Sequence, residues 1–211
     1  MYRLIITGSL AIALMVALSS VFIATSFGTS ENQKSSAGSK TYTNTDYNIK
    51  IEYPKNWKKS ETDLDSHVIV GFKAPDTKDV IDPAGFIISN FQISDNSILD
   101  DFVTYFFKEK YPQPEDYKLI ESSNATVAGM DGRQFILYEY QKSLLEGFPG
   151  STDKVMRVLT LDTNTSNGYS LKYWAQPSLF NKYLPTAQRM FDSFEIVTAR
   201  TQNITAPPEQ K

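Results

Sequence analysis

Cysteine is absent from the 211 residues of this chain, and that absence excludes several kinds of protein. Without cysteine there are no disulfides, no thiolate metal sites, no cysteine nucleophile and no lipid-modified N-terminal cysteine. A folded domain must therefore be stabilised by side-chain packing alone. The material for a core is present, because phenylalanine, tyrosine and tryptophan make up 13% of the residues and each buries a large apolar area.

Histidine is nearly absent as well, since His67 is the only one. One histidine excludes a multi-histidine metal site, and no sequence pattern of a catalytic triad accompanies it. The chain has no Gly-x-Ser-x-Gly, no His-Glu-x-x-His, no phosphate-binding loop and no dinucleotide fingerprint. We therefore predict that the protein is not an enzyme and needs no cofactor beyond a weakly held divalent metal ion.

An excess of basic residues is also missing. The net charge is −3, the isoelectric point is near 5.3, and no basic stripe follows any expected element. Nucleic acids and anionic lipid surfaces bind proteins through clustered lysine and arginine. The sequence therefore excludes both as main partners.

The N-terminus carries a long uncharged segment. No charged residue occurs from residue 4 to residue 30, and Arg3 precedes this mostly apolar run. Such a pattern is typical of an export segment, and about 20 apolar residues span a bilayer. Because Ala24–Gly28 also offers small residues at a cleavage-like spacing, both a signal peptide and an N-terminal membrane anchor fit residues 1–30. In either case the remainder is expected outside the cytoplasm, anchored to the cell membrane or secreted.

The rest of the chain divides into a tether, one domain and a tail. Residues 31–41 are polar and small, and are predicted to form a flexible tether. Residues 198–211 have no periodic apolar face and contain two consecutive prolines, so we expect them to be disordered. Residues 42–197 have the length of one ordinary domain.

Within this domain, seven runs are strand-like and two are helical. The helical runs, residues 97–110 and 178–194, each carry an apolar stripe. Short turns between successive strands favour antiparallel pairing. We predict an α+β fold, a layered architecture in which two amphipathic helices cover an antiparallel sheet. The expected strands are Ile49–Tyr53, His67–Ala74, Gly85–Ile93, Tyr117–Ser122, Arg133–Gln141, Lys154–Asp162 and Gly168–Gln176.

The helix ends have their own signals. Asp100 and Asp101 suit the positive N-terminus of the first helix, and Pro185 is expected to kink the second helix or to mark its first turn. Candidate N-caps of the first helix are Asp95, Asn96 and Ser97.

Two stretches resemble the PsbP-like family. "YNIKIEYPKNW", Tyr47–Trp57, is similar to the family's opening strand, which runs into Tyr-Pro and then Trp. "YLPTAQRMFDSFEI", Tyr183–Ile196, is similar to its closing helix and final strand. The resemblance covers residues 42–197 and implies an antiparallel sheet sandwiched by helices in α/β/α layers. It also implies a non-catalytic extrinsic subunit of the kind found on the lumenal side of photosystem II.

The N-terminus departs from the photosynthetic setting of that family. A plant thylakoid protein begins with an Arg- and Ser-rich transit peptide, whereas this chain has a simple apolar export segment. We therefore expect a prokaryotic exported protein with a use outside photosynthesis.

Trp57 follows a strand that Pro54 ends, because proline has no N–H for the ladder. After such a turn away from the sheet, a tryptophan is well placed to fold back onto the core. We predict that Trp57 is a buried scaffold residue rather than a ligand-stacking one.

Glu139 is the most unusual ionisable residue of the predicted strands. Two-residue alternation places it on the same face as Phe135 and Leu137. A carboxyl group on an apolar face either has a raised pKa and acts as an acid, or lies at a sheet edge or pairs with lysine or arginine. The pairing or edge reading is the commoner one.

Four residues at two-residue spacing offer a weak metal site. Glu61, Asp63, Asp65 and His67 lie on one side of an extended chain. Three carboxylates and an imidazole suit Zn²⁺ or Mn²⁺, but the same pattern describes a solvated loop before a strand. A second group of oxygen ligands suits Ca²⁺, although it lacks the spacing of a calcium loop; its members are Asp76, Asp79 and Asp82.

Three Asn-x-Ser/Thr sequons begin at Asn124, Asn164 and Asn203. In an exported protein they are candidate glycan acceptors. The first two fall in predicted turns and the third in the tail, so all three are expected to be exposed.

The sequence thus predicts an exported, membrane-tethered, non-catalytic domain that docks on or helps assemble a membrane-bound protein complex. Two alternatives stay open: a surface protein that binds Ca²⁺, Mn²⁺ or Zn²⁺, and a photosystem II-type extrinsic subunit. The sequence does not identify the partner complex.

The export prediction can be tested with a single cysteine, because the native chain has none. A membrane-impermeant maleimide should label the Ser36→Cys variant in intact cells, since the tether is expected outside the membrane. Labelling that appears only after lysis would contradict this topology.

Overall fold

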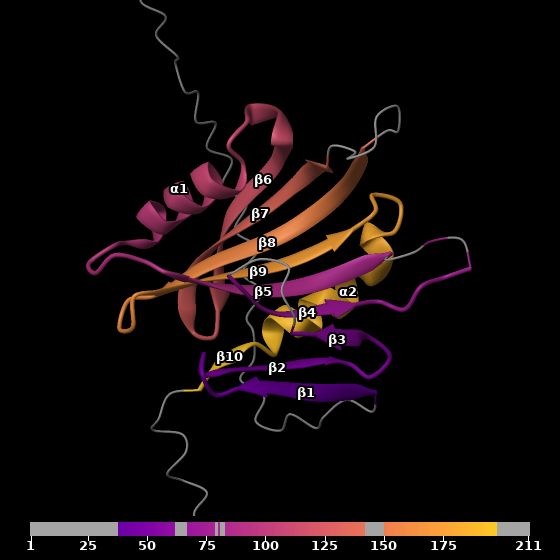
Figure 1. Ribbon diagram of the computed structural model, residues 1–211, viewed down its shortest axis with the longest axis horizontal. Coiled ribbons are helices and arrows are strands. Elements are labelled where there is room, and N and C mark those ends of the chain that lie inside the picture. The colour runs from indigo at the N-terminus through magenta and orange to yellow at the C-terminus, as the bar shows by residue number, and fades with distance from the viewer. Residues whose placement is uncertain (1–37, 62–66, 79, 81–82, 142–149, 198–211) are drawn as a thin grey trace, which may run out of the picture. The chain divides into compact units, whose positions relative to one another are not determined.

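The computed structural model describes residues 38–61, 67–78, 80, 83–141 and 150–197. These residues form ten strands, two α-helices and one short 3₁₀ helix, drawn in Figure 1. The strands are β1 Ser39–Asn44, β2 Ile49–Pro54, β3 Lys58–Ser60, β4 Val68–Lys73, β5 Ala84–Gln92, β6 Tyr117–Val127, β7 Met130–Gln141, β8 Ser151–Asp162, β9 Asn167–Ala175 and β10 Glu195–Ile196. The helices are α1 Leu99–Lys110, η1 Pro114–Asp116 and α2 Phe180–Asp192.

The strands form two antiparallel sheets rather than the single predicted one. The larger has seven strands in the order β3-β4-β5-β9-β8-β7-β6, and the smaller has three in the order β1-β2-β10. Every strand pair is antiparallel. Mostly antiparallel sheets with two helices confirm the α+β class.

Each face of the large sheet has its own core, because side chains alternate along a strand. On β8, Val155 and Leu159 belong to the cluster that α1 covers with Phe102 and Phe106. Met156 belongs to the other cluster, to which α2 and the small sheet contribute. The second face is therefore covered by a helix together with three strands, which corrects the prediction of helices alone on both faces (Figure 1).

The two predicted helices are present, but the predicted caps of α1 are wrong. The helix begins after Ile98, whose backbone N–H donates to the Asp101 carboxylate at 3.1 Å. Asp95 instead accepts a hydrogen bond of 2.8 Å from the Ser166 hydroxyl in the turn between β8 and β9. Asp95 therefore bonds to a residue distant in sequence instead of capping α1.

Pro185 lies inside α2 rather than in its first turn, which begins at Phe180. Proline removes the N–H that would bond the carbonyl four residues earlier. That carbonyl belongs to Asn181, and both residues are at least partly accessible, so solvent can supply the missing donor. The accessible position explains why the helix continues through the proline.

Strand β1 begins at Ser39, inside the range predicted to be a tether, and the folded part therefore starts before residue 42. Of its residues only Tyr42 is buried, so the strand has no apolar alternation to signal it. It exists because its backbone pairs along the whole of β2.

Trp57 is buried, with 5% of its surface exposed, as predicted. β2 ends at Pro54, and the Trp57 backbone N–H donates to the Pro54 carbonyl at 3.0 Å. The indole then packs edge-on against Tyr183 of α2, with ring centroids 6.3 Å apart. The tryptophan thus joins the end of β2 to α2.

None of the helices formed by the described residues is long and apolar enough to cross a membrane. The apolar segment at residues 1–30 lies outside the described residues.

Truncating Trp57 should be costly, because the cavity left between the small sheet and α2 cannot refill. We expect Trp57→Ala to lower the free energy of unfolding by about 3–5 kcal/mol, measured by chemical denaturation. Trp57→Phe keeps most of the ring volume and should cost less. A loss of only a few tenths of a kcal/mol in Trp57→Ala would contradict the core assignment.

Candidate functional site

Three charged side chains from neighbouring strands meet under α1. Glu139 comes from β7, Arg157 from β8 and Lys172 from β9. Only 8%, 4% and 13% of their respective side chains are exposed. Charged groups are rarely buried so completely unless they are paired.

The carboxylate of Glu139 holds this group together. Its Oε1 accepts hydrogen bonds from Arg157 Nη2 at 2.9 Å and from the Tyr111 hydroxyl, and its Oε2 accepts one from Lys172 Nζ. Arg157 also donates to Ser170 Oγ at 2.7 Å. Among the buried side-chain polar atoms of the described residues, Arg157 Nε alone lacks a hydrogen-bond partner.

The same contacts set the protonation of Glu139. Desolvation by burial disfavours the charged carboxylate, but Lys172 and Arg157 overcome it and lower the pKa of Glu139 to about 2. Burial lowers the pKa of Lys172 against the attraction of Glu139. The pairing predicted for Glu139 is therefore confirmed, and its pKa is lowered rather than raised.

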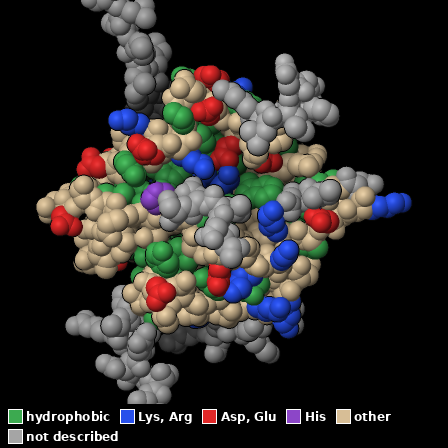
Figure 2. All heavy atoms as spheres, in the orientation of Figure 1, with side chains coloured by type: hydrophobic (Ala, Val, Ile, Leu, Met, Phe, Trp, Pro, Cys, Tyr) green, Lys and Arg blue, Asp and Glu red, His purple; other side chains and the backbone are tan. Residues whose placement is uncertain are grey.

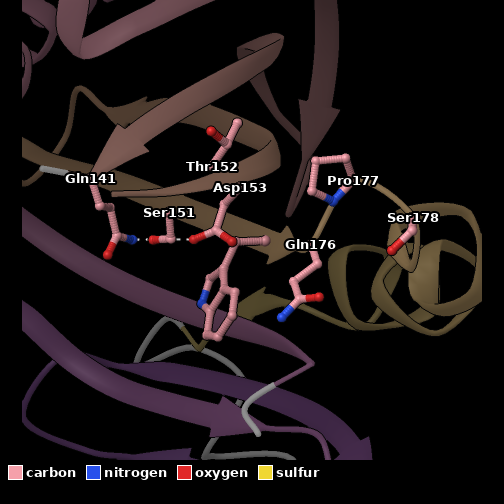
Figure 3. Close-up of a pocket in the computed structure, with 8 residues that line it drawn as sticks. Gln141, Ser151, Thr152, Asp153, Gln176, Pro177 and Ser178 are labelled. Atoms are coloured by element: carbon pink, nitrogen blue, oxygen red, sulfur yellow. Dashed lines mark hydrogen bonds between the residues drawn. The ribbon is translucent and has the colours of Figure 1, made fainter. Parts of the chain in front are cut away.

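Beyond this group, the described surface opens into a hollow of about 450 Å³ where β8 begins and β9 ends. Figure 3 shows Gln141 and Asp153 pointing toward each other on one side of it, with Pro177 and Ser178 on the other. Gln141 Nε2 donates to Asp153 Oδ2 at 3.1 Å. Trp174 also lines the hollow.

The indole of Trp174 packs where Gly85 has no side chain. Gly85 on β5 is its direct cross-strand partner. A Cβ at Gly85 would lie 2.6 Å from the indole, closer than real contacts allow. The ring therefore lies across the glycine backbone, and a larger residue at position 85 would displace it.

Of the predicted metal ligands, the structure describes only Glu61, His67 and Asp76. The Glu61 carboxylate accepts a hydrogen bond of 2.6 Å from Lys59, and the His67 ring stacks on Phe91 at a centroid distance of 4.5 Å. Asp63 and Asp65 lie outside the described residues, as do Asp79 and Asp82, while Asp76 is exposed. No group of three or more metal-ligating side chains occurs in the described part of the chain, and metal binding stays a prediction.

The sequons are accessible where the structure describes them. Asn124 is exposed on β6, and Asn164 is exposed in the turn between β8 and β9. Asn203 lies outside the described residues. Glycosylation stays a prediction for all three.

Charges of both signs occur on the face drawn in Figure 2, in keeping with the small net charge.

The sequence signal for the buried group was a single charged residue in an otherwise apolar stretch of each strand, as in "VMRVLTL" and "SLKYW". Arg157 and Lys172 were missed because neither lies opposite Glu139, whose register partner is Asp153.

No protein-family model matches the chain, and no curated protein matches its sequence. Solved structures do match. Cyanobacterial PsbP (CyanoP) from Synechocystis aligns at a TM-score of 0.55 and 12% identity, over 79% of this chain and 97% of that one. LpqN of Mycobacterium tuberculosis, described as involved in cell envelope biogenesis, aligns at 0.52 and 14%, over 78% and 88% respectively.

The Ran-binding protein Mog1p of Saccharomyces cerevisiae aligns at a TM-score of 0.51 and 10% identity, over 77% of this chain and 97% of that one. The fold is therefore PsbP-like, which confirms the resemblance found in the sequence. Identities this low carry the fold alone.

Removing the charge of Glu139 should destabilise the protein, because two buried cations lose their shared partner. We expect Glu139→Gln to lower the free energy of unfolding at neutral pH by about 3–5 kcal/mol. Glu121→Gln, at an exposed position on β6, is the matched control and should change it by less than about 0.5 kcal/mol.

The same contacts predict a dependence on pH. The pKa of Glu139 is about 2 in the folded state against an ordinary value of 4.5. Its stabilisation is thus complete above 4.5 and is lost as the pH falls toward 2. As the pH falls through this interval, the melting temperature of the wild type should therefore drop more steeply than that of Glu139→Gln. Parallel curves would contradict the ion-pair assignment.

Proposed function

We propose that this chain is an exported, membrane-tethered, non-catalytic domain that docks on, or helps to assemble, a membrane-bound protein complex. The observation that carries the proposal is the edge strand β6. It has eleven residues and, among the described strands, a hydrogen-bonded neighbour on one side only. An extended segment of a partner can pair with such an edge through its backbone.

The side chains of β6 favour a partner that is partly apolar. Leu119 and Ile120 are 47% and 49% exposed, at the point where the register with β7 shifts. Lys118 and Glu121 flank them with opposite charges, and both are exposed. Exposed apolar residues on a sheet edge are a liability unless a partner covers them.

The buried charges support a role without catalysis. Glu139, which sequence alone offered as a candidate acid, accepts hydrogen bonds from three donors and has a lowered pKa. A general acid near neutral pH needs the opposite shift. Glu139 and its partners therefore act as scaffold.

Proteins of this fold include at least one that binds another protein, since yeast Mog1p is described as Ran-binding. LpqN is described through the biogenesis of the cell envelope. The first description agrees with a binding domain and the second with a place in the envelope, although each belongs to its own protein. Metal binding at Glu61 is a weaker alternative, because its carboxylate already pairs with Lys59.

Site-specific photocrosslinking in cells that produce the full chain tests the docking surface. A photoreactive residue at position 119 or 120 should give a discrete adduct with a membrane protein, because the partner strand lies against β6. Tyr47, 41% exposed and apolar but in the turn between β1 and β2, is the matched control position. Adducts of equal yield at all three positions, or none at 119 and 120, would refute docking at this edge.

A further inference from the structure

The hollow where β8 begins and β9 ends has features of a ligand site that docking at β6 does not use. Its volume of about 450 Å³ falls within the range of small-molecule pockets. Its lining combines one indole, one carboxylate, amides and hydroxyls; those used below are Trp174, Asp153, Gln141, Gln176, Ser151 and Ser178.

Trp174 supplies a fixed aromatic surface. The indole lies across Gly85, so the sheet backbone supports one side of the ring. The residue also lines the hollow and is only half-buried. A ring held in this way offers apolar area to a flat ligand at little entropic cost.

Asp153 supplies an acceptor that the described residues do not fully use. The residue is 8% exposed, and among the described side chains it accepts the 3.1 Å hydrogen bond from Gln141 at Oδ2. Burial raises the pKa of its carboxyl group, and the nearby Lys172 only partly offsets this. A buried carboxylate with so few donors is stabilised by a ligand that donates hydrogen bonds to it.

The charges around the hollow favour a neutral ligand. The negative charges of Asp153 and Glu139 are balanced by the positive charges of Arg157 and Lys172, and Asp153 lies directly opposite Glu139 in the sheet. An anion would meet Asp153, and a cation would gain little because Lys172 already offsets part of the charge of Asp153. The amides of Gln141 and Gln176 and the hydroxyls of Ser151 and Ser178 both donate and accept hydrogen bonds.

We propose that this hollow binds a neutral saccharide, which stacks one sugar face on Trp174 and donates a hydroxyl hydrogen bond to Asp153. Hydroxyls arranged around a ring with an apolar face match this combination of an aromatic surface, a carboxylate and neutral polar groups. The site is separate from β6 and does not depend on the proposed docking, so either proposal can fail alone.

Tryptophan fluorescence gives a direct test, because Trp57 and Trp174 are the only two tryptophans. In a Trp57→Phe background, Trp174 reports alone. Maltose and N-acetylglucosamine are titrated into the purified full chain, held in a detergent without a sugar headgroup. We expect a saturable change in emission at millimolar sugar. Saturation-transfer NMR of the same sugars with the wild type is an independent readout of binding.

Variants then distinguish the site from general effects. Asp153→Asn and Gln176→Ala should each lower the affinity for the sugar that binds more tightly to the wild type. For Asp153→Asn we expect a loss of about tenfold, because one hydrogen bond to a charged acceptor is lost. Asp131→Asn, an exposed aspartate on β7, is the matched control and should leave affinity unchanged. Gln176→Ala keeps the test valid if Asp153→Asn folds poorly.

Three results would overturn the proposal. The first is no saturable signal from either sugar with the wild type in both readouts. The second is binding that neither Asp153→Asn nor Gln176→Ala weakens. The third is tighter binding of n-butylammonium than of either sugar, lost in Asp153→Asn, which would assign the hollow to a cationic side chain instead.

Discussion

The carboxylate of Glu139 is the contact on which the arrangement of the large sheet depends. It joins side chains from three consecutive strands and Tyr111 beyond α1. Burying these charges costs free energy that hydrophobic residues of the same size would not cost. What the group adds is register: a slip of one residue in β7, β8 or β9 would move a charge from this face to the opposite one. In a chain without disulfides, this penalty against misaligned strands is a substitute for a covalent constraint.

That structural role also decides what the residue does not do. The two cations that make Glu139 tolerable in the interior are the cause of its lowered pKa, so the stability of the cluster and acid catalysis by Glu139 exclude one another. Arg157 is likewise fixed, by Ser170 and by the Phe106 ring 4.7 Å from its guanidinium carbon. Asp153 lies at the margin of the cluster, where the sheet opens into the hollow, and its carboxylate can accept hydrogen bonds beyond the one from Gln141. The proposed ligand site therefore uses Asp153 rather than the ion-paired residues.

Local patterns predicted most of the elements and few of the contacts between them. The seven alternating runs and the two apolar stripes all became strands and helices, because each buries one face in a core. Strands β1 and β3 were not predicted, since their residues are mostly exposed and only pairing with β2 and β4 makes them strands. Likewise the alternation of Glu139 with Phe135 and Leu137 predicted a carboxylate at a sheet edge or paired with lysine or arginine, and the structure shows the pairing. Its actual partners depend on the registers of two hairpins and on long side chains reaching along the sheet, which no local pattern contains.

Two glycines of the large sheet, Gly168 and Gly85, each leave room for an aromatic ring against the sheet backbone. At Gly168 a Cβ would lie 2.7 Å from the Phe102 ring, and at Gly85 one would lie 2.6 Å from the Trp174 indole. In both places an aromatic ring occupies the space of a missing side chain, so the ring is held by backbone rather than by movable neighbours. Phe102 is fully buried and its seat fixes α1 on the sheet. Trp174 makes the same kind of contact, but it is only half-buried and lines the hollow. A ring fixed by a glycine backbone therefore anchors a helix at Gly168 and leaves a fixed aromatic surface at the hollow at Gly85.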